Sequence, residues 1–284
     1  MILDMNETFD EDPEFIKFIA AQEGKSKATL KQYKSNYIKL RRTLQKPISE
    51  TAEKTAIDAI NAAFDNPNSQ AALFNIVLLV RKCYDMPYDL VVEQRTKNKE
   101  TIDDTLRQVN QYMVLPSIQE YDDYIEDLYQ KEDYLPYVIN HLIRHHYVRN
   151  KDLMFQWVLT QKETQDTSKN YMLYERKKNQ ITWVRNNYKT AGKYGQKKIV
   201  IDNERLQMAL KKCQSRGLFP IAQSDDLIGY HIQKHTFNKL GEGACMKIIV
   251  NHYKHDINML KLISKSRGTD LPTLLTNYNI VYTD

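Results

Sequence analysis

The sequence predicts a mainly α-helical protein, in which an all-α N-terminal domain precedes an α+β domain with a small antiparallel sheet. Helical periodicity runs almost unbroken from residue 12 to residue 114, and glycine is almost absent there. Short aromatic and β-branched runs, which are typical of strands, appear only after residue 150. With 284 residues, of which 42% are hydrophobic and 27% charged, the chain is long enough for two domains with separate cores.

The N-terminal domain is expected to span 12–114 and to consist of helices joined by short connections. Helical spacing, broken by prolines and polar turns, places these helices at 13–22, 27–45, 50–64, 68–84 and 89–113. The stretch AALFNIVLLVRKCY is the most apolar of the chain and is expected to be the core helix. Residues 1–11 form an acidic tail, and VLPS at 114–117 is the expected linker to a second domain at 118–284.

The second domain is expected to begin and end with helices and to hold its strands between them. Two helices are predicted at 118–131 and 133–147, and the chain is predicted to be helical again from Asn203 onwards. The predicted strands are LMFQWVL (153–159), YMLYER (171–176), QITWVR (180–185) and the run KKIVID that follows. The intervening NNYKTAGKYGQ has the Asn and Gly of a hairpin connection.

Basic residues are concentrated in the segment 25–46, which holds eight Lys or Arg and no acid. Its apolar residues recur every three or four positions, so one helix face is expected to be buried and the basic residues to lie mostly on the rest. A solvated helix face is one explanation, but the absence of any acid favours a polyanion, most simply the DNA backbone. The expected DNA-contacting residues are Lys27, Lys31, Lys34, Lys39, Arg41 and Arg42, with Arg185, Lys193 and Lys197 around the hairpin.

Several function classes have no support in the sequence. No apolar run reaches the roughly 18 to 20 residues that cross a bilayer, and the N-terminus lacks a basic leader, so an intracellular protein is expected, in the cytoplasm or the nucleus of a host. The three cysteines form no CxxC and are expected to be free thiols. The histidine pairs in HLIRHH and HYKH lack HExxH or paired cysteines, and phosphate-binding glycine motifs are absent, so neither metal nor cofactor is expected.

Four patterns in the second half occur in a fixed order. They are RNKDL, which begins with Arg149; Lys189 in the hairpin connection; HIQKHTF from His231; and ISKSRGTDLPTLLTNY, which ends with Tyr278. In this order they resemble the catalytic motifs of the tyrosine recombinase (phage integrase) family, and the preceding basic helical domain resembles that family's core-binding domain. The resemblance covers essentially the whole chain and is strongest over 149–282.

This resemblance implies a tyrosine recombinase-like fold and a site-specific recombinase or integrase that acts on double-stranded DNA through a 3′-phosphotyrosyl intermediate, without metal or cofactor. Tyr278 would be the nucleophile, Arg149 would bind the phosphate, Lys189 would protonate the leaving oxygen and His231 would assist proton transfer. Such proteins would assemble as a homo-oligomer, dimer or tetramer, on DNA. A composition rich in Asn, Lys, Tyr and Ile is typical of an AT-rich viral or mobile-element genome.

The sequence departs from the family pattern at several places. The second arginine of the family falls on Lys234, which keeps the charge but loses bidentate geometry, and the last histidine or tryptophan falls on Thr269. Roughly a dozen additional residues are placed at GACMKIIVNHYKH, as an expected extra helix. Six residues follow Tyr278, so the C-terminal helix that docks onto a neighbouring subunit is expected to be missing, and Tyr282 competes as nucleophile.

Three alternatives stay open at this point. Lys234 and Thr269 favour a recombinase-fold DNA-binding protein that is catalytically impaired. A type IB topoisomerase-like enzyme would share the nucleophile and the cations but act as a monomer. A helical adaptor protein without a role on DNA is the third alternative, and strongly salt-dependent DNA binding would argue against it.

Overall fold

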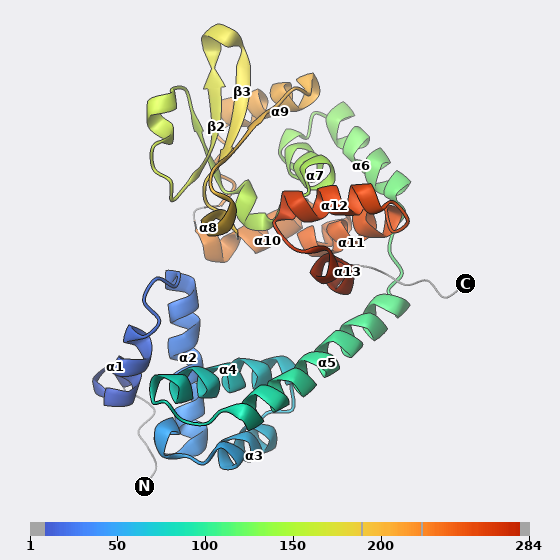
Figure 1. The fold of residues 1–284 in the computed structure, drawn as a ribbon. Helices are drawn as coiled ribbons and strands as arrows, with labels where there is room; N and C mark the ends of the chain where they lie inside the picture. Colours follow the sequence, from blue (N-terminus) through green and yellow to red (C-terminus); the bar gives the residue numbers. More distant parts are fainter. Residues whose placement is uncertain (1–8, 189, 223, 279–284) are drawn as a thin grey trace. The chain divides into compact units, whose positions relative to one another are not determined.

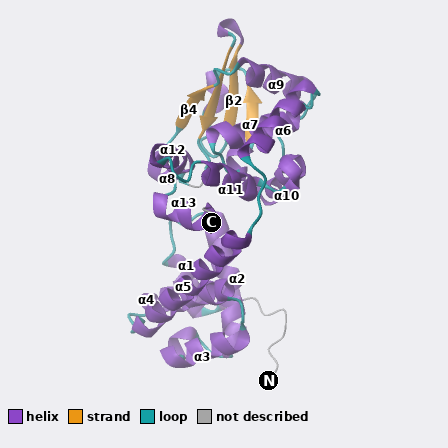
Figure 2. Cartoon of the chain, turned by 90° about the vertical axis from the view of Figure 1, so that its right-hand side faces the viewer, coloured by secondary structure: helices purple, strands orange, loops and turns teal. Residues whose placement is uncertain are grey.

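The computed structural model describes residues 9–188, 190–222 and 224–278, and its contacts divide the chain into two compact units, Met1–Leu106 and Arg107–Asp284 (Figure 1). The described chain is mainly helical and contains one four-stranded sheet (Figure 2). The boundary between these units lies within helix α5 (Asp89–Tyr112), which continues without a break past residue 106.

The first unit contains four further helices close to the predicted positions: α1 (Pro13–Ala20), α2 (Lys27–Leu44), α3 (Glu53–Ala63) and α4 (Pro67–Cys83). Local side chains fix where two of them begin. Asp12 accepts hydrogen bonds from the first amides of α1, and Asn66 does the same for α4. Short 3₁₀ turns at Phe9–Glu11 and Ile48–Glu50 complete the unit.

The apolar face of α2 packs into the core of the first unit, as its spacing predicts. Tyr37 and Leu40 are fully buried, and the Tyr37 ring stacks on Phe18 with centroids 5.7 Å apart. The Tyr37 hydroxyl donates to the buried Glu14 carboxylate at 2.8 Å, and that carboxylate also accepts from the amide of Ile48 at 3.0 Å. These contacts orient α2, so most of its basic side chains lie on the outer faces of the helix.

The second unit takes in the end of α5, continues with α6 (Ile118–Gln130) and α7 (Tyr134–His146), and ends with five helices. The latter are α9 (Glu204–Ser215), α10 (Asp225–His235), α11 (Glu242–His252), α12 (Ile257–Arg267) and α13 (Leu271–Tyr278). Helix α11 occupies the segment that was expected to form an extra helix. Short 3₁₀ turns lie at Asn150–Leu153, Gln161–Thr164, Arg176–Lys178 and Phe237–Lys239.

The sheet has the order β1 (Phe155–Val158), β2 (Asn170–Glu175), β3 (Gln180–Arg185) and β4 (Lys197–Val200). The prediction of a wholly antiparallel sheet is wrong, because β1 pairs with β2 in parallel, with Phe155 opposite Asn170. The other two pairs are antiparallel. The chain returns over residues 159–169 to begin β2 beside the start of β1, and such a crossover makes neighbouring strands parallel.

The core of the second unit joins one face of the sheet to the surrounding helices. Trp183, Met172 and Phe155 of the sheet are essentially buried and belong to the same apolar cluster as Leu142 of α7 and Leu210 of α9. Cys213 and Cys245 are buried free thiols and Cys83 is a half-buried one, which confirms the prediction for the cysteines. None of the helices described is both long and apolar enough to cross a membrane.

Candidate active site and basic groove

The two C-terminal helices bring Tyr278 against Arg267. Helix α12 ends at Arg267, and Gly268 adopts a left-handed conformation (φ +60°) that closes the helix and lets α13 follow after a short turn. The Arg267 Nη2 group donates a hydrogen bond to the Tyr278 hydroxyl at 2.8 Å. The guanidinium carbon lies 5.1 Å from the centre of the Tyr278 ring. The last tyrosine of α13 is therefore held by a cation within its own chain.

Arg267 itself is 2% exposed and is anchored on several sides. Its Nη1 group donates to the carbonyls of Tyr147 at 3.3 Å and Val148 at 3.0 Å. Its Nη2 group forms an ion pair with Glu242 at 2.7 Å. The Nε atom is buried and has no hydrogen-bond partner among the residues that the structure describes. One donor of this guanidinium is thus left without an acceptor.

Arg149 follows the two anchoring carbonyls directly in sequence, which places its half-buried side chain in the same region. Burial and the neighbouring Arg267 lower the pKa of the Arg149 guanidinium, and the charges of Tyr278, Asp152 and Glu242 act in the opposite direction. Within the described ranges, no ion pair joins this guanidinium to an acid. Arg149 therefore keeps its charge available within electrostatic range of Tyr278.

Asp152 fixes the backbone at Arg149 and also pairs with a buried arginine. Its carboxylate accepts from the Arg149 amide at 2.8 Å and forms an ion pair with Arg185 at 2.9 Å, with both side chains nearly inaccessible. Arg185 was expected among the DNA-contacting residues, but it is 1% exposed. The pattern of basic residues could not show this, because the acid that holds Arg185 inside lies in a different element.

The connection between β3 and β4 reaches the end of α12. A Cβ atom on Gly268 would lie 2.0 Å from Thr190 Oγ1, so these two residues are in direct contact. Lys197 Nζ donates to the carbonyls of Lys265 and Ser266, each at 3.4 Å. Burial, followed by the charge of Arg185, lowers the pKa of Lys197. Lys189 and the side chain of Lys193 lie outside the described residues, but the connection that carries them borders the site.

The remaining predicted site residues are not joined to Tyr278. His231 is half-buried on α10, with its ring edge-on to Tyr230 at 5.8 Å. Lys234 is exposed, and its Nζ lies 4.0 Å from the centre of the Tyr230 ring. The carbonyl of the half-buried Thr269 accepts from Ser264 Oγ at 2.5 Å. No hydrogen bond or ion pair between His231 or Lys234 and the Arg267–Tyr278 pair is found in the described chain.

Sequence reasoning missed two residues of this cluster, Arg267 and Glu242. Nothing in SKSRGT distinguishes Arg267 from the neighbouring lysines, and Glu242 lies outside the motifs. A weak signal exists, because Arg267 ends an apolar helical pattern immediately before a glycine, where a cation interacts favourably with the helix dipole. That signal predicts a helix end but not a contact with Tyr278.

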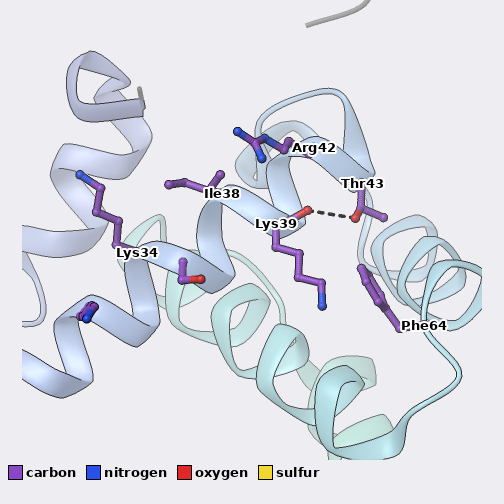
Figure 3. A pocket seen from close by; sticks show the side chains of 8 residues that line it. Lys34, Ile38, Lys39, Arg42, Thr43 and Phe64 are labelled. Atoms are coloured by element: carbon purple, nitrogen blue, oxygen red, sulfur yellow. Dashed lines mark hydrogen bonds between the residues drawn. The ribbon is translucent and has the colours of Figure 1, made fainter. Parts of the chain in front are cut away.

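A basic groove of about 650 Å³ runs along α2 in the first unit (Figure 3). It is lined by Lys31, Lys34, Ser35, Ile38, Lys39, Arg42, Thr43 and Phe64. The Lys39 ammonium lies 4.3 Å from the centre of the Phe64 ring, and Thr43 donates to the Lys39 carbonyl at 3.0 Å. Four of the cations that were predicted to contact DNA line the groove, together with the apolar side chains of Ile38 and Phe64.

The other two predicted cations of this segment lie elsewhere. Lys27 is exposed at the first position of α2. Arg41 differs from the expectation of an outward-facing side chain, because it forms an ion pair with Asp12 at 3.2 Å and only 14% of its side chain is exposed. Its guanidinium also lies 5.6 Å from the Phe9 ring. Arg41 thus ties α2 to the beginning of the unit.

No three His, Cys, Asp or Glu side chains of the described chain are arranged to hold an ion. His141 and His145 lie with ring centroids 4.5 Å apart, and His141 also packs against Tyr137 at 5.4 Å. These contacts belong to the packing of α7.

Comparison with known proteins identifies no family for the chain and gives a weak similarity to a solved structure. No protein-family model matches the chain, and no curated protein matches it. Among solved structures, the chain is weakly similar to one described as "Crystal structure of XerA recombinase", with 16% sequence identity and a TM-score of 0.36. That similarity covers 96% of this chain and 95% of the other.

Proposed function

We propose that the protein binds double-stranded DNA and breaks and rejoins one strand at a time through a covalent bond between Tyr278 and the 3′-phosphate. The observation that carries this proposal is the 2.8 Å hydrogen bond from Arg267 to the Tyr278 hydroxyl, in a site that also holds Arg149. A tyrosine among arginines is suited to attack a phosphodiester, since the cations favour both the phenolate and the negatively charged phosphate.

Each chemical role has a candidate residue. The Tyr278 oxygen forms a bond to phosphorus while the bond from phosphorus to the 5′-oxygen breaks, so no free energy is needed from ATP. The sequence pattern assigns the phenol proton to His231, which has no hydrogen bond to Tyr278 in the described chain and would have to approach it when DNA is bound, and the leaving 5′-oxygen takes a proton from Lys189. Arg149 presents its N–H groups to a nonbridging oxygen of the phosphate. Reversal of these steps rejoins a strand.

DNA binding is assigned mainly to the groove along α2. Its four cations carry the charge that phosphates require, and Ser35 and Thr43 add hydroxyl groups at its edge. Lys197 and the connection between β3 and β4 would add contacts beside the scissile phosphate. Because phosphate contacts dominate, this binding is expected to weaken steeply as the salt concentration rises.

A nicked duplex that traps the covalent intermediate tests the proposal directly. After the strand is cut, the short fragment beyond the cleavage point diffuses away, and the protein stays attached to labelled DNA through a bond that survives denaturing electrophoresis. The native protein is expected to form this adduct, and Tyr278→Phe is expected to form none while it binds DNA with nearly unchanged affinity. Tyr282→Phe serves as the matched control and is expected to retain the adduct. An adduct that persists in Tyr278→Phe and disappears in Tyr282→Phe would assign the nucleophile to Tyr282.

A DNA-binding protein without catalysis is the second candidate. The exposed position of Lys234, stacked on Tyr230 and without a bond to Tyr278, favours it. The same experiment separates the two functions, since this candidate predicts salt-dependent binding and no covalent band on any duplex. Relaxation of supercoiled plasmid by the native protein would instead favour a topoisomerase.

A further inference from the structure

The reaction proposed above needs a second cation at the phosphate, and Lys234 is poorly placed to supply it. Two nonbridging oxygens gain negative charge as the phosphorus becomes five-coordinate, and one arginine cannot bind both oxygens and the nucleophile at once. Lys234 is exposed and rests on the ring of Tyr230. Its ammonium also lacks the paired N–H groups that match a phosphate edge.

Arg267 has the properties that Lys234 lacks. It is 2% exposed, it touches the nucleophile, and Nη1 bonds to two carbonyls fix its plane. Its Nε–H is buried without an acceptor. The Nε atoms of Arg41 and Arg185 are also buried without an acceptor, but those side chains pair with Asp12 and Asp152. Arg267 instead touches the proposed nucleophile, so the acceptor proposed for its Nε is an oxygen of the substrate. The Nε atom and one Nη2 hydrogen lie on the same edge of the guanidinium, which is the edge that receives two oxygens of one phosphate.

We infer that Arg267 is the second phosphate-binding arginine of the site and that Glu242 positions it; this inference rests on the proposed function. As the Tyr278 oxygen bonds to phosphorus, Arg267 keeps its hydrogen bond to that oxygen and directs Nε towards a nonbridging oxygen. Arg149 then binds the other nonbridging oxygen. No bond to Arg267 is made or broken in the step, and its proton count does not change.

Glu242 explains how two arginines can lie together before DNA arrives. Burial, followed by the charge of Arg267, lowers the pKa of the Arg149 guanidinium, so the two like charges repel each other. The Glu242 carboxylate, 2.7 Å from Nη2 and with 11% of its side chain exposed, offsets that repulsion. This carboxylate accepts from Nη2 and leaves Nε without an acceptor. Glu242 is therefore a positioning residue that acts through Arg267.

The test compares two substrates that differ in charge at the scissile linkage. One is the ordinary nicked duplex, and the other carries a methylphosphonate there, in which a neutral methyl group replaces one charged oxygen. Arg267→Ala is expected to lower the rate of adduct formation on the ordinary duplex by about 10²-fold or more. On the methylphosphonate its rate should recover substantially, because less charge then needs to be stabilised. Lys261→Ala, at an exposed lysine of the same helix, is the matched control and should behave like the native protein on both substrates, whereas Lys234→Ala tests the competing assignment.

Each outcome decides a different claim. An Arg267→Ala protein that is slowed equally on both substrates has lost a structural residue, and the inference is overturned. Selective rescue of Lys234→Ala by the methylphosphonate would return the role to Lys234. Failure of the native protein to form any adduct would overturn the proposed function, and the inference with it. Arg267→Lys retains a positive charge but lacks the two parallel N–H groups of the guanidinium. It therefore provides the same comparison of substrates if the alanine variant does not fold.

Discussion

Gly268 and Thr190 meet without room for a methyl group between them. A Cβ on Gly268 would lie 2.0 Å from Thr190 Oγ1 and 3.1 Å from Thr190 Cβ, and the φ angle of Gly268 is +60°. This glycine ends the helix that carries Arg267, and Thr190 belongs to the connection that carries Lys189. The contact therefore joins two segments that the proposed reaction needs to keep together.

Gly268→Ala is expected to lower the free energy of unfolding by roughly 1–3 kcal/mol, since both the backbone conformation and the contact with Thr190 become strained. Urea denaturation measures the loss. Gly243→Ala is the matched control, because Gly243 lies in helix α11 and nothing is found within 4 Å of an added Cβ. It should leave stability unchanged or slightly raised. Equal stability of the native and Gly268→Ala proteins would contradict the described contact.

Asn110 links the helix α13 that carries Tyr278 to helix α11. It is 1% exposed, accepts from Lys247 Nζ at 2.7 Å and donates towards the Thr276 carbonyl at 3.5 Å. Asn110→Ala should leave the Lys247 ammonium without this acceptor and loosen α13. The rate of adduct formation is expected to fall while the affinity for DNA stays the same.

Asn258→Ala, at an exposed position of α12, is the control for this change and should alter neither quantity. Kinetic trapping on the nicked duplex and an equilibrium binding assay together give both quantities. A loss of affinity without a loss of rate in Asn110→Ala would show that the residue does not act through α13.

Two histidines of α7 make stability depend on pH. Burial lowers the pKa of His141 to about 3 and that of His146 to about 4. Between these values and about pH 6.5, both histidines are neutral in the folded protein. In the unfolded chain the same histidines, with a pKa near 6.5, bind protons in that range. Stability is therefore expected to fall as the pH drops from about 6.5 towards 4.

His141→Phe should remove a large part of this dependence, roughly 2–3 kcal/mol between pH 6.5 and 4.5. Urea denaturation at these two pH values measures it. His255→Phe, at an exposed residue, should show the same pH dependence as the native protein. If His141→Phe also keeps the full dependence, His141 is not the group that becomes protonated on unfolding.

The basic groove predicts how DNA binding responds to salt. Lys31→Ala and Lys39→Ala should each reduce the slope of log K against log salt concentration by about 0.9, the value for one phosphate contact on duplex DNA. Lys99→Ala, at an exposed lysine of α5, should leave the slope unchanged. Arg41→Ala should change stability more than the slope, because Arg41 is paired with Asp12. Unchanged slopes for both groove variants would remove the groove from the DNA interface.

Much of the fold follows from local patterns, and the exceptions have specific causes. Helices such as α2 and α4 were predictable because their apolar spacing and their capping residues agree about where they begin. The direction of β1 could not be predicted, because a short apolar run has the same pattern in a parallel and in an antiparallel pair of strands. The linker at VLPS stays a prediction, because it rests on composition alone, whereas the contact-based division lies within α5.

The site was less predictable than the fold because its contacts join residues far apart in sequence. Arg149 and Tyr278 could be proposed from ordered motifs, and their roles stay predictions. Arg267 could not be proposed from the sequence, because its partners Tyr147 and Val148 lie about 120 residues earlier in the chain. Arg185 and Arg41 were placed at the surface by composition alone, whereas Asp152 and Asp12 hold them inside.

The anchoring of Arg267 on the carbonyls of Tyr147 and Val148 has a consequence for mutational studies. Those two residues directly precede Arg149, so one turn of backbone sets the position of both guanidinium groups. A change in this turn would displace two charges together and keep their spacing nearly constant. Double substitutions within 147–149 and at Arg267 should therefore cost much less than the sum of the single ones, and the cluster would behave as one cooperative unit.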